Sequence, residues 1–485
     1  MKAHCFFLFV FFIAHFQVVS AQGLQKDEYQ RDFDFFQTVF EKTNSGLYRY
    51  HTKTEVDSLF HAQRKKITAQ TSYRDFYQLL WKVIDFTGSL HNNLDYPDSL
   101  QRNLKKENIF FPLPLRYMEG ALLVNAPYKG LQVGDQILSI NGIDSQVFAQ
   151  DVGQFRSTDG YNTTGKYAAL QTQKLADYSY LAYGRQKEFI LRYSSKGSIK
   201  SIRLAATDHS TFEKQYEKRS RLEVEQKEQN LYFFEFLESD IGYLRVSSFA
   251  IGREGSPAYK DFAAFLGRVF KELKQQKTQN LIVDIRGNGG GIDPCELLLY
   301  SYMTSRKFRE NTQAYTRGYH FPFPEQLRLP GTSVAEQVAE AKKRFTRPQG
   351  DRYYQNPAYN PVWKPHPDRF KHHIYVLIDP FVASAASHYA AMMKSDRKAV
   401  LIGQETSGGY YGHTGHYNIT YQLPHTGLSL SFSVVNLEQD VRELSDQKPG
   451  RGIIPDHTVE QRLEDYIEQK DRVLNYTLNQ IRNRN

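Results

Sequence analysis

Two segments of the chain contain residue types suited to acyl transfer, and the first of them surrounds Ser384. Residues 381–388 read FVASAASH and lie between a predicted strand at 374–378 and a predicted helix at 384–394. A serine at such a junction presents its hydroxyl, and the next backbone N–H, from Ala385, points to the same place, as in a nucleophile elbow. The G-x-S-x-G motif itself is absent. The alternative interpretation is that Ser384 only caps the helix.

The second segment, residues 284–291, reads DIRGNGGG and follows a predicted buried strand. Its glycines expose backbone N–H groups at the carboxyl end of that strand, which is where α/β sheets bind ligands. Such donors can form an oxyanion hole. The spacing G-x-G-x-x-G and the P-loop lysine are both absent, which argues against a nucleotide site. The alternative interpretation is a tight turn without chemistry.

Both segments lie within residues 232–470, where predicted strands and helices alternate. Strands are expected at 242–246, 281–285, 374–378 and 399–402, and apolar residues at helical spacing predict a helix over 262–273. This alternation is typical of a parallel sheet with right-handed crossovers. Residues 306–372 interrupt it and are interpreted as an insertion that overhangs the site. Its aromatic residues are expected to line a peptide cleft: Tyr315, Tyr319, Phe321, Phe323, Tyr353, Tyr354 and Trp363.

The chain before this stretch divides into two predicted units. Residues 22–105 are expected to be helical, with an amphipathic helix over 75–86 that stops at Gly88. Residues 106–205 contain short apolar runs between turn signals such as Asn141-Gly142, which predict a small β-rich unit. The remaining segments are a charged linker at 206–231 and a C-terminal helix at 471–485.

The first 21 residues have the pattern of a secretion signal. Lys2 precedes ten apolar residues at 5–14, a run too short to span a bilayer, and Val19 and Ala21 are the small residues of a cleavage site. The alternative is an uncleaved anchor. We therefore expect an exported protein of the periplasm, the envelope surface or the medium, either soluble or held peripherally at a membrane.

The composition excludes several classes of protein. The 485 residues carry 62 Lys and Arg against 53 Asp and Glu, a net charge of +9 that is spread along the chain, so nucleic-acid binding is not predicted. Two cysteines, Cys5 and Cys295, exclude a disulfide framework and a four-cysteine zinc module. No H-E-x-x-H sequence occurs, and neither a metal nor another cofactor is expected.

Several segments, in this order, together resemble the tail-specific, or C-terminal processing, peptidase family of serine proteases. They are residues 33–50, 76–94, 130–142, 284–291, 384–387, 403–409 and 450–456. The resemblance implies an α+β multidomain fold: a ClpP/crotonase-like α/β catalytic core, a helical N-terminal domain and a PDZ-like domain at 106–205. It also implies cleavage of peptides or unfolded proteins. A clear G-L-G-F loop, which would bind a carboxylate, is missing before Leu122. Whether this domain recognises substrate C-termini therefore stays open, and the alternative is that it gates the active site.

The resemblance assigns Ser384 as the nucleophile, and the N–H groups of Ala385 and of Gly289 or Gly290 as the oxyanion hole. The bacterial processing branch of the family pairs its serine with a lysine 25 residues further on, but position 409 here is glycine. The tricorn-like branch instead takes its base from an N-terminal histidine, and His91 fits that position.

A histidine with a pKa of about 6.5 suits a general base at neutral pH. Within this sequence, His413 and His416 are the rivals of His91, because they follow the 403–409 motif closely. His388 is less favoured because it lies one helical turn from Ser384 and points along the helix.

The third catalytic residue is less well defined by the resemblance. The acid expected from the tricorn-like branch would fall at Pro449. Glu405 is the first substitute, with Asp446, Glu443 or a backbone carbonyl as alternatives. A weakly active or inactive protein that binds peptides or hydrophobic ligands on the same scaffold, as the retinoid-binding relatives do, is the competing function. The oligomeric state is not predicted.

Overall fold

The computed structural model describes residues 23–226, 230–291, 294–329 and 332–484. The expected secretion signal lies outside these ranges. The pair Asp293-Pro294 predicts the start of a helix with Asp293 as its cap, and Asp293 also lies outside them. Among the described residues, no helix is long and apolar enough to cross a membrane.

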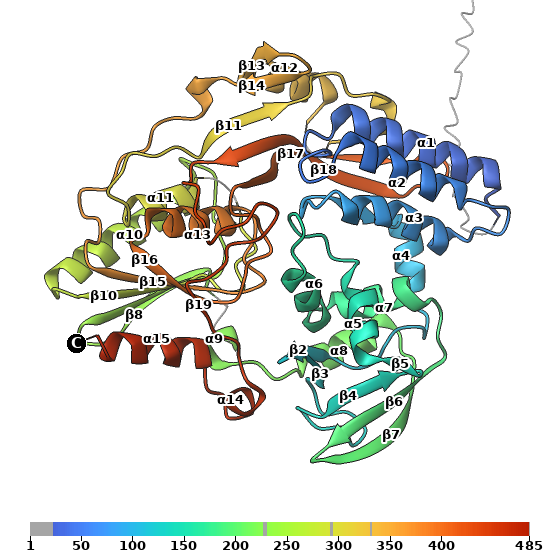
Figure 1. The fold of residues 1–485 in the computed structure, drawn as a ribbon, viewed down its shortest axis with the longest axis horizontal. Helices are drawn as coiled ribbons and strands as arrows, with labels where there is room; N and C mark the ends of the chain where they lie inside the picture. Colours follow the sequence, from blue (N-terminus) through green and yellow to red (C-terminus); the bar gives the residue numbers. More distant parts are fainter. Residues whose placement is uncertain (1–22, 227–229, 292–293, 330–331, 485) are drawn as a thin grey trace, which may run out of the picture.

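The N-terminal part is helical, as the sequence predicts. Its helices are α1 (Lys26–Thr43), α2 (Lys53–Lys65), α3 (Tyr73–Phe86) and α4 (Asp98–Leu104). Capping boxes start α2 and α3, where Thr52 pairs with Glu55 and Ser72 with Asp75. The helix α3 ends just before Gly88, whose φ of +62° a side chain would disfavour. Figure 1 shows α1, α2 and α3 beside the long strands β17 and β18, and α4 nearer the next part of the chain.

The next part is a small sheet with helices, here named the β2–β7 unit. Its strands are β2 (Leu115–Met118), β3 (Ala121–Val124), β4 (Gln136–Ile140), β5 (Ile143–Asp144), β6 (Glu188–Ser195) and β7 (Ser198–Ala205). Its helices are α5 (Ser145–Gly153), α6 (Thr164–Ala168), η1 (Ala169–Gln171) and α7 (Lys174–Tyr183). The main path of the sheet runs β2-β3-β4-β6-β7. Asn141 and Gly142 both have positive φ, as a tight turn between β4 and β5 requires.

The segment interpreted as a linker is partly folded, which corrects the prediction. It contains α8 (His209–Glu217) and α9 (Glu223–Gln226). Phe212 of α8 is fully buried in the apolar cluster of the β2–β7 unit. The charged residues Lys214 and Glu217 lie on the exposed face of this helix, so α8 belongs to the unit.

The core is a six-stranded sheet in the order β19-β16-β15-β10-β9-β8. The strands are β8 (Tyr232–Glu238), β9 (Ile241–Val246), β10 (Asn280–Asp284), β15 (His373–Ile378), β16 (Ala399–Gly403) and β19 (His457–Thr458). Every neighbouring pair except β8–β9 is parallel, which confirms the predicted parallel sheet. The helices are α10 (Pro257–Gln275), α11 (Cys295–Ser301), α13 (Ala385–Asp396), α14 (Leu463–Ile467) and α15 (Arg472–Arg482).

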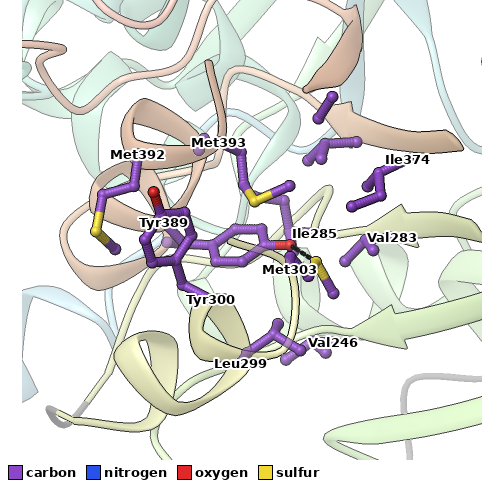
Figure 2. Packing of buried hydrophobic residues seen from close by; sticks show 14 of the residues in the cluster. Val246, Val283, Ile285, Leu299, Tyr300, Met303, Ile374, Tyr389, Met392 and Met393 are labelled. Carbon is purple, nitrogen blue, oxygen red and sulfur yellow. Dashed lines mark hydrogen bonds between the residues drawn. The ribbon is translucent and has the colours of Figure 1, made fainter. Parts of the chain in front are cut away.

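The apolar core of this sheet packs tightly behind the helix α13. Tyr389 and Tyr300 are fully buried there, and the Tyr389 hydroxyl donates to Met303 Sδ at 2.8 Å (Figure 2). The phenol therefore keeps a partner inside an otherwise apolar cluster, as a buried polar group requires. This packing fixes α13 against β10 and β15.

A second, seven-stranded sheet was not predicted. It contains β1 (Asn93–Asp95), β11 (Asn311–Thr316), β12 (Leu327–Arg328), β13 (Phe345–Gln349), β14 (Arg352–Gln355), β17 (Gly412–Gln422) and β18 (Ser429–Gln439). The segment 306–372 also holds η2 (Pro324–Gln326), α12 (Val334–Arg344) and η3 (Pro357–Tyr359). The predicted insertion thus supplies strands to a sheet built on the β17–β18 hairpin (Figure 1).

The aromatic residues of the 306–372 segment pack into the protein rather than lining an open cleft. Phe321 is buried, and Tyr319 and Tyr353 lie against the cluster shared with the N-terminal helices. Trp363 packs against the core cluster instead. Phe323 is exposed to 38% but packs against Phe35 in a tilted arrangement, with ring centroids 4.7 Å apart. The peptide-cleft expectation is not supported by this packing.

Candidate active site

Ser384 lies at the junction of β15 and α13 in a strained backbone conformation. Its φ of 51° and ψ of −127° fall where residues other than glycine rarely lie, at a cost of about 1–3 kcal/mol. Although Ser384 occupies the N-cap position, its side chain makes no capping hydrogen bond. The capping alternative therefore fails, and the hydroxyl is left without a capping role.

This strain can be measured by comparing two inactive variants. We expect Ser384→Gly to unfold at higher denaturant concentration than Ser384→Ala, by about 1 kcal/mol, because glycine adopts this φ without a Cβ clash. Equilibrium unfolding of both proteins in urea measures the difference. Equal stabilities would show that the backbone at residue 384 is not strained.

The glycine-rich turn after β10 touches the nucleophile segment. A Cβ on Gly290, whose φ is +101°, would lie 2.8 Å from Ser384 Cβ and 3.0 Å from Ala385 N. Only glycine fits at this distance. Asn288 fixes the turn, because its carbonyl accepts the Ala383 N–H at 3.2 Å. The structure therefore brings the two segments predicted from the sequence together.

The backbone N–H groups that the resemblance implies as oxyanion donors differ in whether they already make a hydrogen bond. Within the described ranges, the N–H groups of Ala385 and Gly289 donate to no acceptor. The Gly290 N–H is already taken, because it donates to Asn288 Oδ1 at 2.9 Å. The geometry therefore favours Gly289 as the donor and gives Gly290 the task of allowing close approach.

His91 lies in the loop between α3 and β1, where β1 pairs with β18 and fixes its position. Its ring stacks on His413 with centroids 5.9 Å apart, and among the described residues its Nε2 is buried without a hydrogen-bond partner. Burial, and secondly the charge of His416, lower the pKa of His91 to about 4. The ring is therefore neutral, and able to accept a proton, at pH 7.

A segment of the β2–β7 unit, residues 156–160, ties the His91 loop to the nucleophile side. Asp159 Oδ1 accepts the Leu90 N–H at 3.1 Å, and Oδ2 accepts the Gly409 N–H at 2.9 Å. The neighbouring Gly408 is close enough to the nucleophile that an added Cβ would lie 3.3 Å from Ser384 N. Asp159 thus links the loop of the predicted base to the loop beside the nucleophile.

Sequence reasoning missed Asp159. The only local signal is the dipeptide Asp159-Gly160, which predicts a turn and nothing more. Burial raises the pKa of Asp159 to about 7, against the two N–H groups and Arg49, which lower it. The carboxyl group therefore titrates in the neutral range.

The other histidines have partners of their own. His416 Nε2 contacts Glu310 Oε1 at 2.5 Å, and His388 Nδ1 lies 3.5 Å from Glu296 Oε1. His413 Nδ1 lies 3.1 Å from the Gln439 amide nitrogen, and its burial holds its pKa well below the usual value. Across the described part of the chain, no group of three or more potential ligands is arranged to hold a metal.

Glu405 has partners other than His91. Its carboxylate accepts Arg451 Nε at 2.8 Å and the Gly452 N–H at 2.9 Å. The alternative acid Asp446 pairs with Lys394 at 2.9 Å, and Glu443 is exposed. Glu405 therefore supports the 450–456 motif, and the structure does not bring it to the imidazole.

Comparison with known proteins confirms the family resemblance. Residues 240–459 match the model of peptidase family S41. Over 217 residues the chain is 23% identical to the tail-specific protease of Haemophilus influenzae. The aligned residues make up 44% of this chain and 24% of that protein. The match thus spans about a quarter of the relative's length.

The fold is shared with solved structures over nearly the whole chain. Mature CPAF in complex with lactacystin superposes with a TM-score of 0.62 at 16% identity, covering 94% of this chain and 97% of that one. Mature CPAF alone gives 0.61 at 16% identity, covering 92% and 94%. At this identity the likeness establishes the fold.

Proposed function

We propose that this chain, whose residues 240–459 form a domain of peptidase family S41, is a serine peptidase that cleaves peptides or unfolded proteins. The observation that carries the proposal is the strained Ser384, whose hydroxyl has no capping role and which lies against the glycine turn. Strain at a residue with an unused nucleophilic group is typical of active sites.

In the proposed reaction, His91 removes the Ser384 proton as the oxygen attacks the peptide carbonyl. The N–H groups of Ala385 and Gly289 stabilise the oxyanion. His91 then gives its proton to the leaving amine, and water hydrolyses the acyl-enzyme by the same steps.

The proposed base and nucleophile are not yet hydrogen-bonded to each other. In the part of the structure described, no hydrogen bond joins the Ser384 hydroxyl to the His91 ring. Catalytic hydrogen bonds of free enzymes often tighten only when substrate binds. The proposal therefore includes a turn of the His91 ring toward Ser384 in the substrate complex, while Asp159 holds the backbone of its loop.

A fluorophosphonate probe tests the proposal directly. The purified protein is expected to form a covalent adduct, located at Ser384 by peptide mass mapping, and to hydrolyse unfolded casein. A protein that neither reacts nor cleaves, yet binds peptides or apolar ligands, would instead support the binding protein on the same scaffold. The missing acid beside His91 is the observation that favours this second function.

We also propose that the protein acts outside the cytoplasm, at the envelope or in the medium, on the strength of the signal-like residues 1–21. Fractionation of cells with an antibody to the core domain tests this. Retention of the full-length chain in the cytoplasm would contradict it.

The pH dependence of the reaction should report Asp159 rather than His91. With the pKa of Asp159 raised to about 7 by burial, its ionised form accepts both N–H groups only above neutrality. The rate constant kcat/KM is therefore expected to fall as the pH drops through about 7. Asp159→Asn should lower kcat/KM by about tenfold, because its amide can accept only one of the two bonds. It should also remove the ionisation near pH 7.

Stability gives an independent signature of the same group. The folded pKa of Asp159 is above its unfolded value of 3.8, so its contribution to stability is complete below about pH 4 and is lost as the pH rises through about 7.

For the pH profile of kcat/KM, Asp32→Asn is the matched control. Asp32 is a buried carboxylate that also accepts two backbone N–H bonds, from His425 and Thr426. If both variants leave the pH profile of kcat/KM unchanged, the positioning role of Asp159 is wrong.

A further inference from the structure

Arg156 is a partly buried cation that the proposed mechanism leaves without a task. Its Nε is buried, and within the described residues its guanidinium makes no hydrogen bond or ion pair. The guanidinium also lies over the ring of Phe381, whose centroid is 5.6 Å from Arg156 Cζ. Other buried arginines have carboxylates: Arg286 binds Asp284 and Asp471.

An unpaired buried guanidinium is costly, because it loses its hydration without gaining an anion. Burial accordingly lowers the pKa of Arg156, and Tyr178 and Asp379 oppose the shift. Asp379 is a poor counterion, because its Oδ1 accepts the N–H groups of Gly287 and Phe381, both at 3.0 Å, and burial raises its own pKa. The site is therefore short of a negative charge.

The position of Arg156 relates this deficit to the active site. Phe381 belongs to the turn that leads to Ser384, three residues further on. Arg156 itself begins the segment 156–160, in which Asp159 accepts the Leu90 and Gly409 N–H groups beside the proposed site. A negative charge brought next to Phe381 would satisfy the guanidinium and lie beside the nucleophile turn.

The adjoining cavity also favours an anion. It has a volume of about 260 Å³, is lined by Phe381 and Asp379, and lies between the β2–β7 unit and the carboxyl edge of the core sheet. Arg219 and Arg221 also line it, and neither forms an ion pair with a described carboxylate; Arg219 donates only to the Tyr216 carbonyl, at 3.0 Å. Ligands of α/β sheets bind at this edge.

We propose that Arg156 binds a carboxylate of the peptide substrate and so makes the protein select acidic peptides. This inference rests on the proposed peptidase function and names its substrate class. A guanidinium binds a carboxylate through two parallel, charge-assisted hydrogen bonds, which a neutral amide cannot reproduce. The carboxylate comes either from a Glu or Asp side chain near the cleaved bond or from the end of the peptide chain.

Binding to the inactive Ser384→Ala protein separates these sources without requiring turnover. The probes are fluorescein-labelled peptides of ten Ala and Leu residues in which one position is replaced by Glu or by Gln. Each peptide is made with a free and with an amidated C-terminus, which gives four forms, and the replaced position is moved along the chain. We expect at least one acid form to bind about tenfold more tightly than its amide counterpart, the size of one charge-assisted hydrogen bond. Adding Arg156→Gln should reduce this ratio to about one, and Arg156→Lys should leave part of it.

Arg306→Gln is the matched control, because Arg306 also lies over an aromatic ring, Tyr300 at 6.0 Å, but is paired with Asp396 at 2.9 Å and Asp440 at 2.7 Å, and it does not line the cavity. It should leave the acid-to-amide ratio intact. Thermal unfolding shows whether each variant folds. If Arg156→Gln does not fold, the acid-to-amide ratio of Arg156→Lys decides the test. A ratio near one in the Ser384→Ala protein, or one unchanged by both Arg156 variants, overturns the proposal. Absence of probe labelling in wild type would overturn the peptidase function alone, since this assay needs no catalysis.

Discussion

Ser384→Ala is expected to abolish fluorophosphonate labelling and to lower peptide hydrolysis by about 10⁴- to 10⁶-fold, the range for loss of a serine nucleophile. The oxygen that would form the acyl-enzyme is absent in this variant, while the oxyanion donors at Ala385 and Gly289 remain. The residual rate, set by those donors and by substrate binding, should still exceed that of the uncatalysed reaction. Stopped-flow hydrolysis of a fluorogenic peptide, with labelling of the same sample, measures both effects.

Ser387→Ala is the control for this result. Ser387 lies in the first turn of α13, where its hydroxyl donates to the Ser384 carbonyl at 2.7 Å, so it is a second serine in the same short segment. Loss of the Ser387 hydroxyl should lower the rate of peptide hydrolysis by at most a few powers of ten. It should leave fluorophosphonate labelling intact. Labelling that survives Ser384→Ala but disappears in Ser387→Ala would move the nucleophile to residue 387.

The elements around Ser384 could be predicted because their signals are local. The helix α3, the strands β9, β10, β15 and β16, and the Asn141-Gly142 turn each follow from periodicity or turn residues within about a dozen positions. The strand-to-helix junction that strains Ser384 is likewise defined by its neighbours. The family resemblance added the roles of the residues, and the structure now places the two segments in contact.

The second sheet and the Asp159 link could not be predicted, because both depend on residues far apart in the sequence. Asp159 bonds Leu90 and Gly409, which are 69 and 250 positions away. The strand β11 pairs with β18 across more than a hundred residues. Nothing in the local pattern distinguishes Asp159 from any turn aspartate, or a paired strand from an irregular insertion.

Glu405 shows a different limit of sequence reasoning. It was predicted as the catalytic acid because it has a carboxylate and lies in the 403–409 motif, and the sequence does not reveal which groups that carboxylate binds. Arg451 and the Gly452 N–H occupy its carboxylate, so it orders the loop next to the site. Its two oxygens together accept four hydrogen bonds, from Arg451, Gly452 and Thr164, so no acceptor position is left to orient an imidazole. The proposed reaction therefore depends on His91 without an acid on its ring, which leaves the histidine as the most sensitive test of the mechanism.

His91→Gln is expected to lower kcat of peptide hydrolysis by at least about 10³-fold while leaving peptide binding nearly unchanged, because only the transition state needs the proton transfer. His413→Gln and His416→Gln are the matched variants, since they remove the two rival histidines. Each should lower kcat far less, although both side chains are partly or fully buried and their loss should cost stability. A collapse of kcat in either rival, with His91→Gln active, would reassign the base.

Chemical rescue distinguishes the loss of a base from a local collapse. In His91→Gly the ring leaves a space next to His413, and added imidazole should restore part of kcat in proportion to its neutral form. The rescued rate should therefore rise with pH through the pKa of free imidazole, whereas wild type should follow Asp159 near pH 7, since burial lowers the pKa of His91 to about 4. Rescue that also occurs in Ser384→Ala would mean that imidazole acts on the peptide itself, and the Ser384–His91 pair would then have no support from this experiment.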